Sequence, residues 1–352
     1  PNINSVSYTI SGNHDRDGDG NPAFRIEGDR LLVNDSGDLI PLETKISPLA
    51  AGGYHSLAVK EGGTVVAWGR NNYGQGSIPE TLGDVSALSA GVWHSMALRE
   101  NGTVMAWGNN NHGQINVPSG LQEVISVAAG AQHSLALTSQ GTLVAWGRNN
   151  NGQARIPTGL DDVISIAAGG YHNLALKKGG SVVAWGNNSN GQANVPSNLN
   201  GVIAIAAGGF HSLALREDGT VIAWGQNTYG QRNVPAALQS IDHPDFVRIT
   251  DIAAGSYHNI ALREDGTLVA WGRNNYQQGN VPEGLGSVIA VAAGLYHNII
   301  LQEDGKIVTW GNNDYEQADA PQEIQIAKPD VKIQSNLQIL IRASDGTLSD
   351  DA

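Results

Sequence analysis

The sequence predicts an all-β protein built from many short antiparallel strands, and three observations lead to this prediction. Glycine makes up 45 of the 352 residues, nearly double the usual share of about 7%, which indicates many tight turns. Apolar residues alternate with period two in segments such as 163–169, the spacing of β-strands. Histidine and tryptophan recur at a constant interval over most of the chain, which indicates an internal repeat.

The repeating unit is about 39 residues long, and seven copies lie between residues 45 and 321. Successive histidines are separated by 39, 39, 39, 39, 47 and 39 residues, and the tryptophans keep the same intervals. The histidines are His55, His94, His133, His172, His211, His258 and His297. The tryptophans are Trp68, Trp107, Trp146, Trp185, Trp224, Trp271 and Trp310. One structural unit is therefore expected to occur seven times.

Each unit has the pattern of a small antiparallel sheet. In residues 163–169 the side chains become smaller towards the end, as suits an innermost strand crowded around an axis. Residues 172–176 follow as a second strand, and dipeptides such as Asp218-Gly219 favour a tight hairpin. The third strand, 221–224, ends in a tryptophan that can fill the space between neighbouring sheets, and a proline such as Pro118 is expected in an outer edge strand. Four strands in each of seven units describe a seven-bladed β-propeller, with blades starting near residues 46, 85, 124, 163, 202, 249 and 288.

Two recurring sequence motifs resemble the regulator-of-chromosome-condensation repeat. They are Ala-Ala-Gly-x-x-His-Ser-Leu-Ala-Leu and Ala-Trp-Gly-x-Asn-x-x-Gly-Gln. The resemblance covers residues 45–321 and implies a β-propeller. The units are compact and run from Gly-Gln almost directly into Val-Pro, which is similar to the bacterial members of this family.

The flanking segments, 1–45 and 328–352, do not fit the repeat. Joined end to end, segments 42–45 and 337–346 resemble a bacterial cadherin-like repeat. We therefore expect the propeller, residues 46–327, to be inserted into a small, split cadherin-like β-sandwich formed by the two termini. A closed ring of blades brings its own ends together, so a host loop can accept it. Two unrelated tails that pack on the propeller are the alternative.

An acidic string near the N-terminus predicts a calcium site. Asp15, Asp17 and Asp19 belong to an Asp-x-Asp-x-Asp-Gly sequence, the oxygen-rich loop that calcium prefers. The resemblance to cadherin-like repeats adds Glu43 and Asp345 as ligands. A solvated acidic turn is the alternative.

The seven histidines are expected to be structural rather than catalytic. A catalytic site needs different residues that converge at one place, whereas these occur once per blade. We expect each imidazole to bond to nearby backbone. The sequence contains no Gly-x-Ser-x-Gly, His-Glu-x-x-His or P-loop motif, so we predict that the protein is not an enzyme.

The residue before each histidine predicts a recognition surface. These residues are Tyr54, Trp93, Gln132, Tyr171, Phe210, Tyr257 and Tyr296. Aromatic side chains gathered on one exposed face are common anchors for proteins and glycans, although they could equally cover the blade ends. Eight extra residues fall within 238–250, where His243 and Phe246 make either a contact loop or a tolerated surface insertion.

Composition excludes several other classes of function. A net charge of −13 without a basic cluster argues against nucleic-acid binding, and no apolar run approaches the roughly 18 residues of a membrane helix. The lack of cysteine excludes disulfides and thiolate metal sites. Because the chain begins at Pro1, we expect a processed protein or part of a longer one.

The sequence favours an extracellular or cell-surface binding module, from a prokaryote, that recognises a protein or glycan with one propeller face. The alternative is a structural subunit of a surface layer, sheath or fibre that self-associates through calcium and sandwich contacts. A third function, exchange factor for small GTPases, is implied by the chromatin-associated family member; the acidic charge and the compact repeats oppose it.

Overall fold

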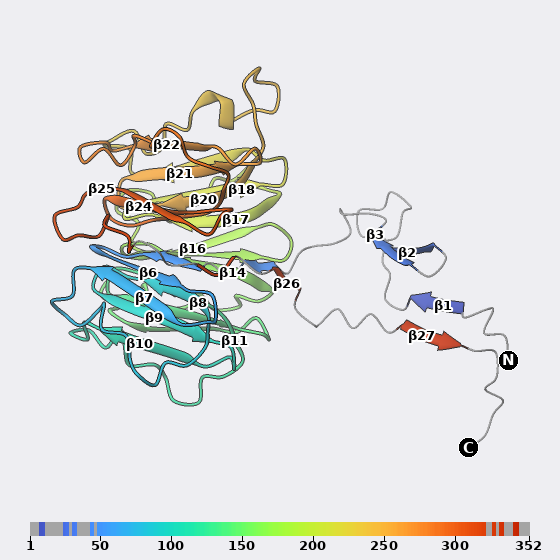
Figure 1. Ribbon diagram of the computed structural model, residues 1–352, viewed down its shortest axis with the longest axis horizontal. Helices are drawn as coiled ribbons and strands as arrows, with labels where there is room; N and C mark the ends of the chain where they lie inside the picture. Colours follow the sequence, from blue (N-terminus) through green and yellow to red (C-terminus); the bar gives the residue numbers. More distant parts are fainter. Residues whose placement is uncertain are drawn as a thin grey trace. The chain divides into compact units, whose positions relative to one another are not determined.

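The computed structural model describes residues 7–10, 24–27, 30–33, 43–45, 48–321, 326–328, 331–333 and 341–344. The chain divides into two compact units (Figure 1). One is Ile46–Asp330, and the other combines Pro1–Lys45 with Val331–Ala352. Within the described part of the chain, no helix is long and apolar enough to cross a membrane.

The larger unit contains seven three-stranded antiparallel sheets, each connected in the order first, middle and third strand. The first strands are β5 (Leu49–Ala51), β8 (Val85–Ala90), β11 (Val124–Ala129), β14 (Val163–Ala168), β17 (Val202–Ala207), β20 (Ile249–Ala254) and β23 (Val288–Ala293). The middle strands are β6 (His55–Val59), β9 (His94–Arg99), β12 (His133–Thr138), β15 (His172–Lys177), β18 (His211–Arg216), β21 (His258–Arg263) and β24 (His297–Gln302). The third strands are β7 (Val65–Gly69), β10 (Val104–Gly108), β13 (Leu143–Gly147), β16 (Val182–Gly186), β19 (Val221–Gly225), β22 (Leu268–Gly272) and β25 (Ile307–Gly311). A short 3₁₀ helix, η1 (Ala236–Leu238), precedes β20.

The seven sheets form a closed ring of blades. Each first strand lies beside the first strand of the next blade, and β23 contacts β5, which closes the circle. The hydrophobic clusters join consecutive blades; in one of them Leu57 of the first blade packs with Leu88, Ala97 and Trp107 of the second. The middle strands are buried because both of their faces lie against neighbouring blades. The prediction of an all-β, seven-bladed propeller is therefore confirmed.

The prediction of a fourth strand in each blade was wrong, because every described blade has three. After β10 the chain forms turns instead, in which the Asn116 N–H donates to the Gly113 carbonyl and the Leu121 N–H donates to the Pro118 carbonyl. Proline has no N–H of its own to contribute to a further ladder. The third strand is therefore the outer edge of the blade.

The first blade is completed by the chain that follows the seventh. β5 has three residues where the other first strands have six. In the second blade Val85 pairs with Arg99, and the equivalent of Arg99 in the first blade, Lys60, pairs with Ile326. Ile326 is fully buried, in a cluster with Leu49 and Leu301. It therefore fills the position that the truncated β5 leaves open.

The two ends of the ring meet on a single strand, β6. The Val59 N–H donates to the carbonyl of Pro48, just before β5, at 2.8 Å, and the Val59 carbonyl accepts from the Ala327 N–H at 2.9 Å. The chain thus reaches and leaves the propeller at adjacent positions, the geometry that insertion into another domain requires.

The smaller unit pairs strands from both termini. Its strands are β1 (Ser7–Ile10), β2 (Phe24–Glu27), β3 (Arg30–Val33), β4 (Glu43–Lys45), β26 (Val331–Ile333) and β27 (Ile341–Ser344). β1 pairs with β27 and β4 with β26, while β2 pairs with β3, all antiparallel. The arrangement of these strands as a cadherin-like sandwich stays a prediction.

The predicted calcium ligands belong to this unit. Asp15, Asp17, Asp19 and Asp345 lie outside the described residues, and Glu43 is described as the first residue of β4, opposite Ile333. Calcium binding stays a prediction. Among the residues with described side chains, no group of three or more His, Asp or Glu could hold a metal ion.

Candidate functional site: an aromatic face

The turn between the first and middle strand of each blade carries the predicted aromatic residues, all of them half-buried. They form two arcs of rings. Tyr54 stacks on Trp93 with 5.3 Å between centroids and lies 6.4 Å from Tyr296. On the other side, Phe210 stacks on Tyr257 at 5.5 Å and lies 6.3 Å from Tyr171. Gln132 occupies the remaining position, between the blades of Trp93 and Tyr171. We call this inner row and the outer row described next the aromatic face.

An outer row of tyrosines lies on the Asn-rich turn that follows the third strand. It consists of Tyr73, Tyr229, Tyr276 and Tyr315, whose exposed fractions are 47%, 41%, 39% and 39%. Each contacts an inner-row ring: Tyr73 with Trp93 at 5.4 Å, Tyr315 with Tyr54 at 5.2 Å, Tyr229 with Tyr257 at 5.2 Å and Tyr276 with Tyr296 at 5.3 Å. These tyrosines were not among the residues predicted from the sequence. The signal is a tyrosine two residues before the glutamine in four of the seven units.

Two arginines, each just after a Trp-Gly pair, lie among these rings. The Arg70 Cζ atom is 4.5 Å from the Tyr315 centroid and 4.8 Å from that of Trp93. The Arg273 Cζ atom is 4.8 Å from the Tyr229 centroid and 5.1 Å from that of Tyr296. These distances are those of cation–π contacts. Each guanidinium is therefore held among aromatic rings rather than free in solvent.

A third arginine, Arg148, has a different environment. Its guanidinium donates to the Gln132 side-chain oxygen and lies 5.5 Å from the Tyr171 centroid. The glutamine that interrupts the inner row is thus the hydrogen-bond partner of an arginine. Burial raises the pKa of Tyr54 and Tyr257, so these two phenols stay neutral at physiological pH.

The histidines hold neighbouring blades together through one repeated network. In the first pair of blades, His55 Nε2 lies 2.9 Å from Ser95 Oγ, and this hydroxyl donates to the Gln75 carbonyl at 2.8 Å. Trp107 Nε1 donates to the same carbonyl at 2.9 Å. Because the hydroxyl proton is committed to Gln75, the imidazole must donate through Nε2. The histidine partner is therefore a side chain of the next blade, not the nearby backbone that the sequence analysis expected.

The same network recurs around the ring, with asparagine in place of serine in three blades. The remaining histidine contacts are His94–Ser134, His133–Asn173, His172–Ser212, His211–Asn259, His258–Asn298 and His297–Ser56. The last of these joins the seventh blade to the first. Burial lowers the pKa of His55, His133, His211 and His258 to about 4 and that of His94, His172 and His297 to about 3. All seven are therefore uncharged at neutral pH.

A sequence profile of the regulator of chromosome condensation (RCC1) repeat matches residues 49–75, 85–114, 124–153, 163–192, 202–231, 249–278 and 288–317. The chain belongs to the RCC1 repeat family. Each matched segment runs from the first strand to the buried glutamine, so the family pattern coincides with the network that joins the blades.

Known structures share this fold. Prp20p from Saccharomyces cerevisiae is 22% identical, with a TM-score of 0.64 over 87% of this chain and 91% of that one. The ectodomain of the receptor kinase CR4 from Physcomitrella patens is 20% identical, with a TM-score of 0.62 over 76% and 73%. The ectodomain of the Arabidopsis thaliana receptor kinase ACR4 is 23% identical, with a TM-score of 0.61 over 76% and 97%. No significantly similar sequence was found among curated proteins.

The glycine before each RCC1-repeat turn is required by close approach. A Cβ atom on Gly91 would lie 2.4 Å from His94 Cε1 and 2.4 Å from the Gly130 carbonyl oxygen of the next blade. A backbone neighbour at this distance cannot give way, so the Ala-Ala-Gly sequence leaves room for the imidazole and the adjacent blade.

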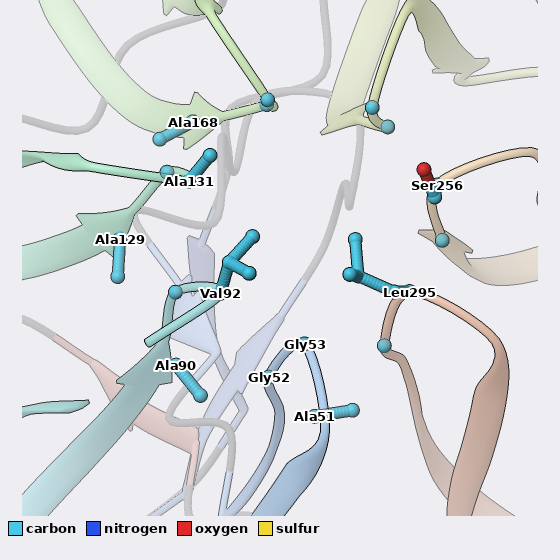
Figure 2. A pocket seen from close by; sticks show the side chains of 18 of the residues that line it. Ala51, Gly52, Gly53, Ala90, Val92, Ala129, Ala131, Ala168, Ser256 and Leu295 are labelled. Carbon is cyan, nitrogen blue, oxygen red and sulfur yellow. The ribbon is translucent and has the colours of Figure 1, made fainter. Parts of the chain in front are cut away.

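The axial opening of this RCC1 propeller is narrow. A cavity of about 80 Å³ is lined by alanines and glycines at the ends of the first strands, and the side chains of Val92 and Leu295 project into it (Figure 2). Backbone bonds between blades reinforce the rim, for example from the Gly53 N–H to the Gly91 carbonyl at 3.0 Å and from the Leu295 N–H to the Gly52 carbonyl at 3.3 Å. The described lining residues of the opening include no charged side chain.

The eight-residue insertion stands apart from the aromatic rows. It lies between η1 and β20, and it is held partly by its own turn, in which the Phe246 N–H donates to the His243 carbonyl at 2.9 Å. Ile241 in this loop is 59% exposed. Among the described residues, no ring contact joins Phe246 to the aromatic face. A contact role for His243 and Phe246 stays a prediction, separate from that face.

The hydrogen bonding of the buried glutamine in each RCC1 repeat depends on the residue that follows the Trp-Gly pair. In three blades its amide donates to an asparagine just after Trp-Gly: Gln114 to Asn109 at 2.9 Å, Gln192 to Asn187 at 2.8 Å, and Gln317 to Asn312. Where arginine holds that position, the Nε2 atoms of Gln75, Gln153 and Gln278 have no acceptor in the described residues, although these side chains are fully buried. In the fifth blade Gln226 fills the position, and the Nε2 atom of Gln231 is likewise without an acceptor. Arginine thus removes a hydrogen bond that asparagine supplies.

This difference predicts opposite effects of two exchanges on stability. Asn109→Arg deprives Gln114 of its acceptor, so we expect the free energy of unfolding to fall by about 1–3 kcal/mol, the usual range for an unpaired buried donor. Arg148→Asn, in the blade with the weakest cation–π contact, should raise it by about 1 kcal/mol. Urea unfolding followed by tryptophan fluorescence measures both. Equal stability of the two variants would show that the amide has another acceptor.

Proposed function

We propose that this RCC1 propeller is a non-enzymatic binding module that recognises a protein or glycan partner through its aromatic face. The observation that carries the proposal is the contact between the inner and outer rows, which presents four tyrosines at 39–47% exposure over a base of half-buried rings. Rigid aromatic side chains provide large contact area at little conformational cost.

A catalytic role for the histidines is disfavoured by their environment. Each is fully buried, bonded through Nε2 to the next blade and uncharged at neutral pH. An imidazole in this state cannot reach a substrate or exchange protons with one. The histidines therefore hold the scaffold on which the aromatic face is displayed.

Similar propellers support a binding role. Prp20p has been studied for its binding to Gsp1p and histones, and the CR4 structure is the ectodomain of a receptor kinase. An extracellular or cell-surface location belongs to the proposal and is supported by the cadherin-like resemblance of the termini.

Arrays of immobilised peptides and glycans test the proposal. We expect the full chain to bind a subset of spots, and the Trp93→Ala and Tyr296→Ala variants to lose that binding while keeping the parent circular dichroism spectrum. Glu303→Ala, an exposed change on the turn at the other end of the middle strand, is the matched control and should bind as the parent does. Binding that survives both aromatic variants would refute a role for this face.

A further inference from the structure

Among the described residues, the arginines of the aromatic face form no ion pair. Arg70, Arg148 and Arg273 are half-buried, and within residues 48–321 and 326–328 no carboxylate forms an ion pair with them. Their Nε atoms are buried and also lack a partner there. A partly desolvated guanidinium without an anion is unfavourable unless something outside the chain supplies one.

Acidic residues are concentrated at the other end of the blades. The turns between middle and third strands contain Glu61, Glu100, Glu217, Asp218, Glu264, Asp265, Glu303 and Asp304. Of the seven Asn-rich turns on the aromatic face, only that of the last blade is acidic, with Asp314, Glu316 and Asp319. Arg70, Arg148 and Arg273 therefore lie at the end of the blades whose turns carry fewer carboxylates, in a chain with a net charge of −13.

The fold itself gains little from these arginines. Asparagine in the same position satisfies the buried glutamine, and arginine leaves that amide donor unpaired in all three blades where it occurs. The cation–π contacts compensate in part. Within the described residues the Nε atoms of Arg70 and Arg273 have no hydrogen-bond acceptor, and a guanidinium can bind a carboxylate through two parallel hydrogen bonds.

Two of the arginine sites are joined. Tyr54 lies 5.7 Å from Arg70 Cζ, Tyr296 lies 5.1 Å from Arg273 Cζ, and the two rings are 6.4 Å apart. The two cations thus flank a continuous aromatic strip across the sixth, seventh and first blades. Such a strip suits a short extended segment with two separated acidic side chains and apolar or aromatic residues between them.

We propose that the aromatic face binds an acidic peptide segment of a partner protein, with one carboxylate on Arg70 and another on Arg273. The inference rests on the proposed function and names the partner chemistry of the same site. A dense polyanion is a poorer match, because Asp314, Glu316 and Asp319 lie on the turn that carries Tyr315, a ring in contact with Arg70.

Selection of a phage-displayed library of random 12-residue peptides on the full chain tests this inference. We expect enriched peptides to contain an excess of Asp and Glu, and a synthetic copy of the best one to bind at least about tenfold more weakly to Arg70→Asn and to Arg273→Asn. The same loss is expected when its acidic residues are replaced by Asn and Gln. Both arginine variants use a residue that other blades carry at this position, so they should fold at least as well as the parent.

Arg155→Asn is the matched control, because it removes the same charge from an exposed arginine that has no ring contact among the described residues. Its affinity should stay within about twofold of the parent. Enriched peptides without acidic excess that lose binding in Trp93→Ala but not in Arg70→Asn would overturn the acidic partner and leave the aromatic-face proposal intact. Enriched peptides that bind Trp93→Ala and Arg70→Asn as well as the parent would overturn both the acidic partner and the aromatic-face proposal. Arginine-dependent binding of a heparin oligosaccharide without any enriched peptide, or an arginine-dependent dimer in light scattering, would overturn the choice of a peptide partner.

Discussion

Acidification from pH 7 to pH 4 is expected to unfold the propeller in one steep transition, because its seven buried histidines are neutral in the folded state. Burial holds their pKa values at about 3 to 4, whereas the ordinary value is 6.5. Between these limits the unfolded chain binds protons that the folded chain does not. The contribution of the neutral histidines to the free energy of unfolding is therefore fully present above about pH 6.5 and is lost as the pH falls towards 4.

The expected slope is large. Each histidine lowers the free energy of unfolding by up to about 1.4 kcal/mol per pH unit below its unfolded pKa, and the seven act together because each joins two blades. Urea titrations at several pH values, monitored by the fluorescence of the interface tryptophans, measure how the free energy of unfolding changes with pH. His55→Gln, whose amide can still donate to Ser95, should reduce the slope by about one histidine equivalent, while His112→Gln, on an exposed turn, should not. A free energy of unfolding that is constant from pH 7 to pH 5 would contradict the prediction.

Replacement of Ile326 by alanine is expected to destabilise the whole ring by about 2–4 kcal/mol. Ile326 is fully buried between the first and last blades, and it completes the first strand of the first blade. Ile203, on a first strand but 49% exposed, is the matched control, and Ile203→Ala should change stability by less than about 0.5 kcal/mol.

Urea unfolding measures the stability of both variants, and the cooperativity of the transition shows whether the ring opens as a unit. Equal effects of the two substitutions would mean that the closure contact contributes no more than an ordinary surface position.

Repetition made the blades predictable, and features without repetition escaped sequence reasoning. The constant spacing of His55 and its counterparts indicated seven similar units. Ile326 gave no comparable signal, because it occurs once and acts on a strand about 270 residues earlier in the chain. The number of strands per blade was overestimated because a proline-containing segment satisfied its bonds locally.

The candidate site was partly predictable for the same reason. The inner aromatic row stands beside the repeated histidine and was identified directly. The outer row occurs in only four of the seven turns, so it is not part of the constant repeat pattern and was missed. The role of the arginines could not be predicted from the sequence. It depends on a hydrogen bond that forms in the blades with asparagine, such as Asn109, and is missing in the blades with arginine. The partner of each histidine lies in the next blade. The motif around each histidine does not show this, so a hydrogen bond to nearby backbone was predicted instead.

The meeting of both propeller ends on β6 determines how this domain responds to mechanical load. Tension applied through the chain at Pro48 and Ala327 acts first on Val59, which bonds to both, and on the buried side chain of Ile326. The other six blades lie outside this short load path until the contact yields. Once it yields, nothing covalent holds the circle shut, and the blades can be drawn out one after another from the free edge. Single-molecule extension of the chain would then record one high-force event followed by a series of smaller ones.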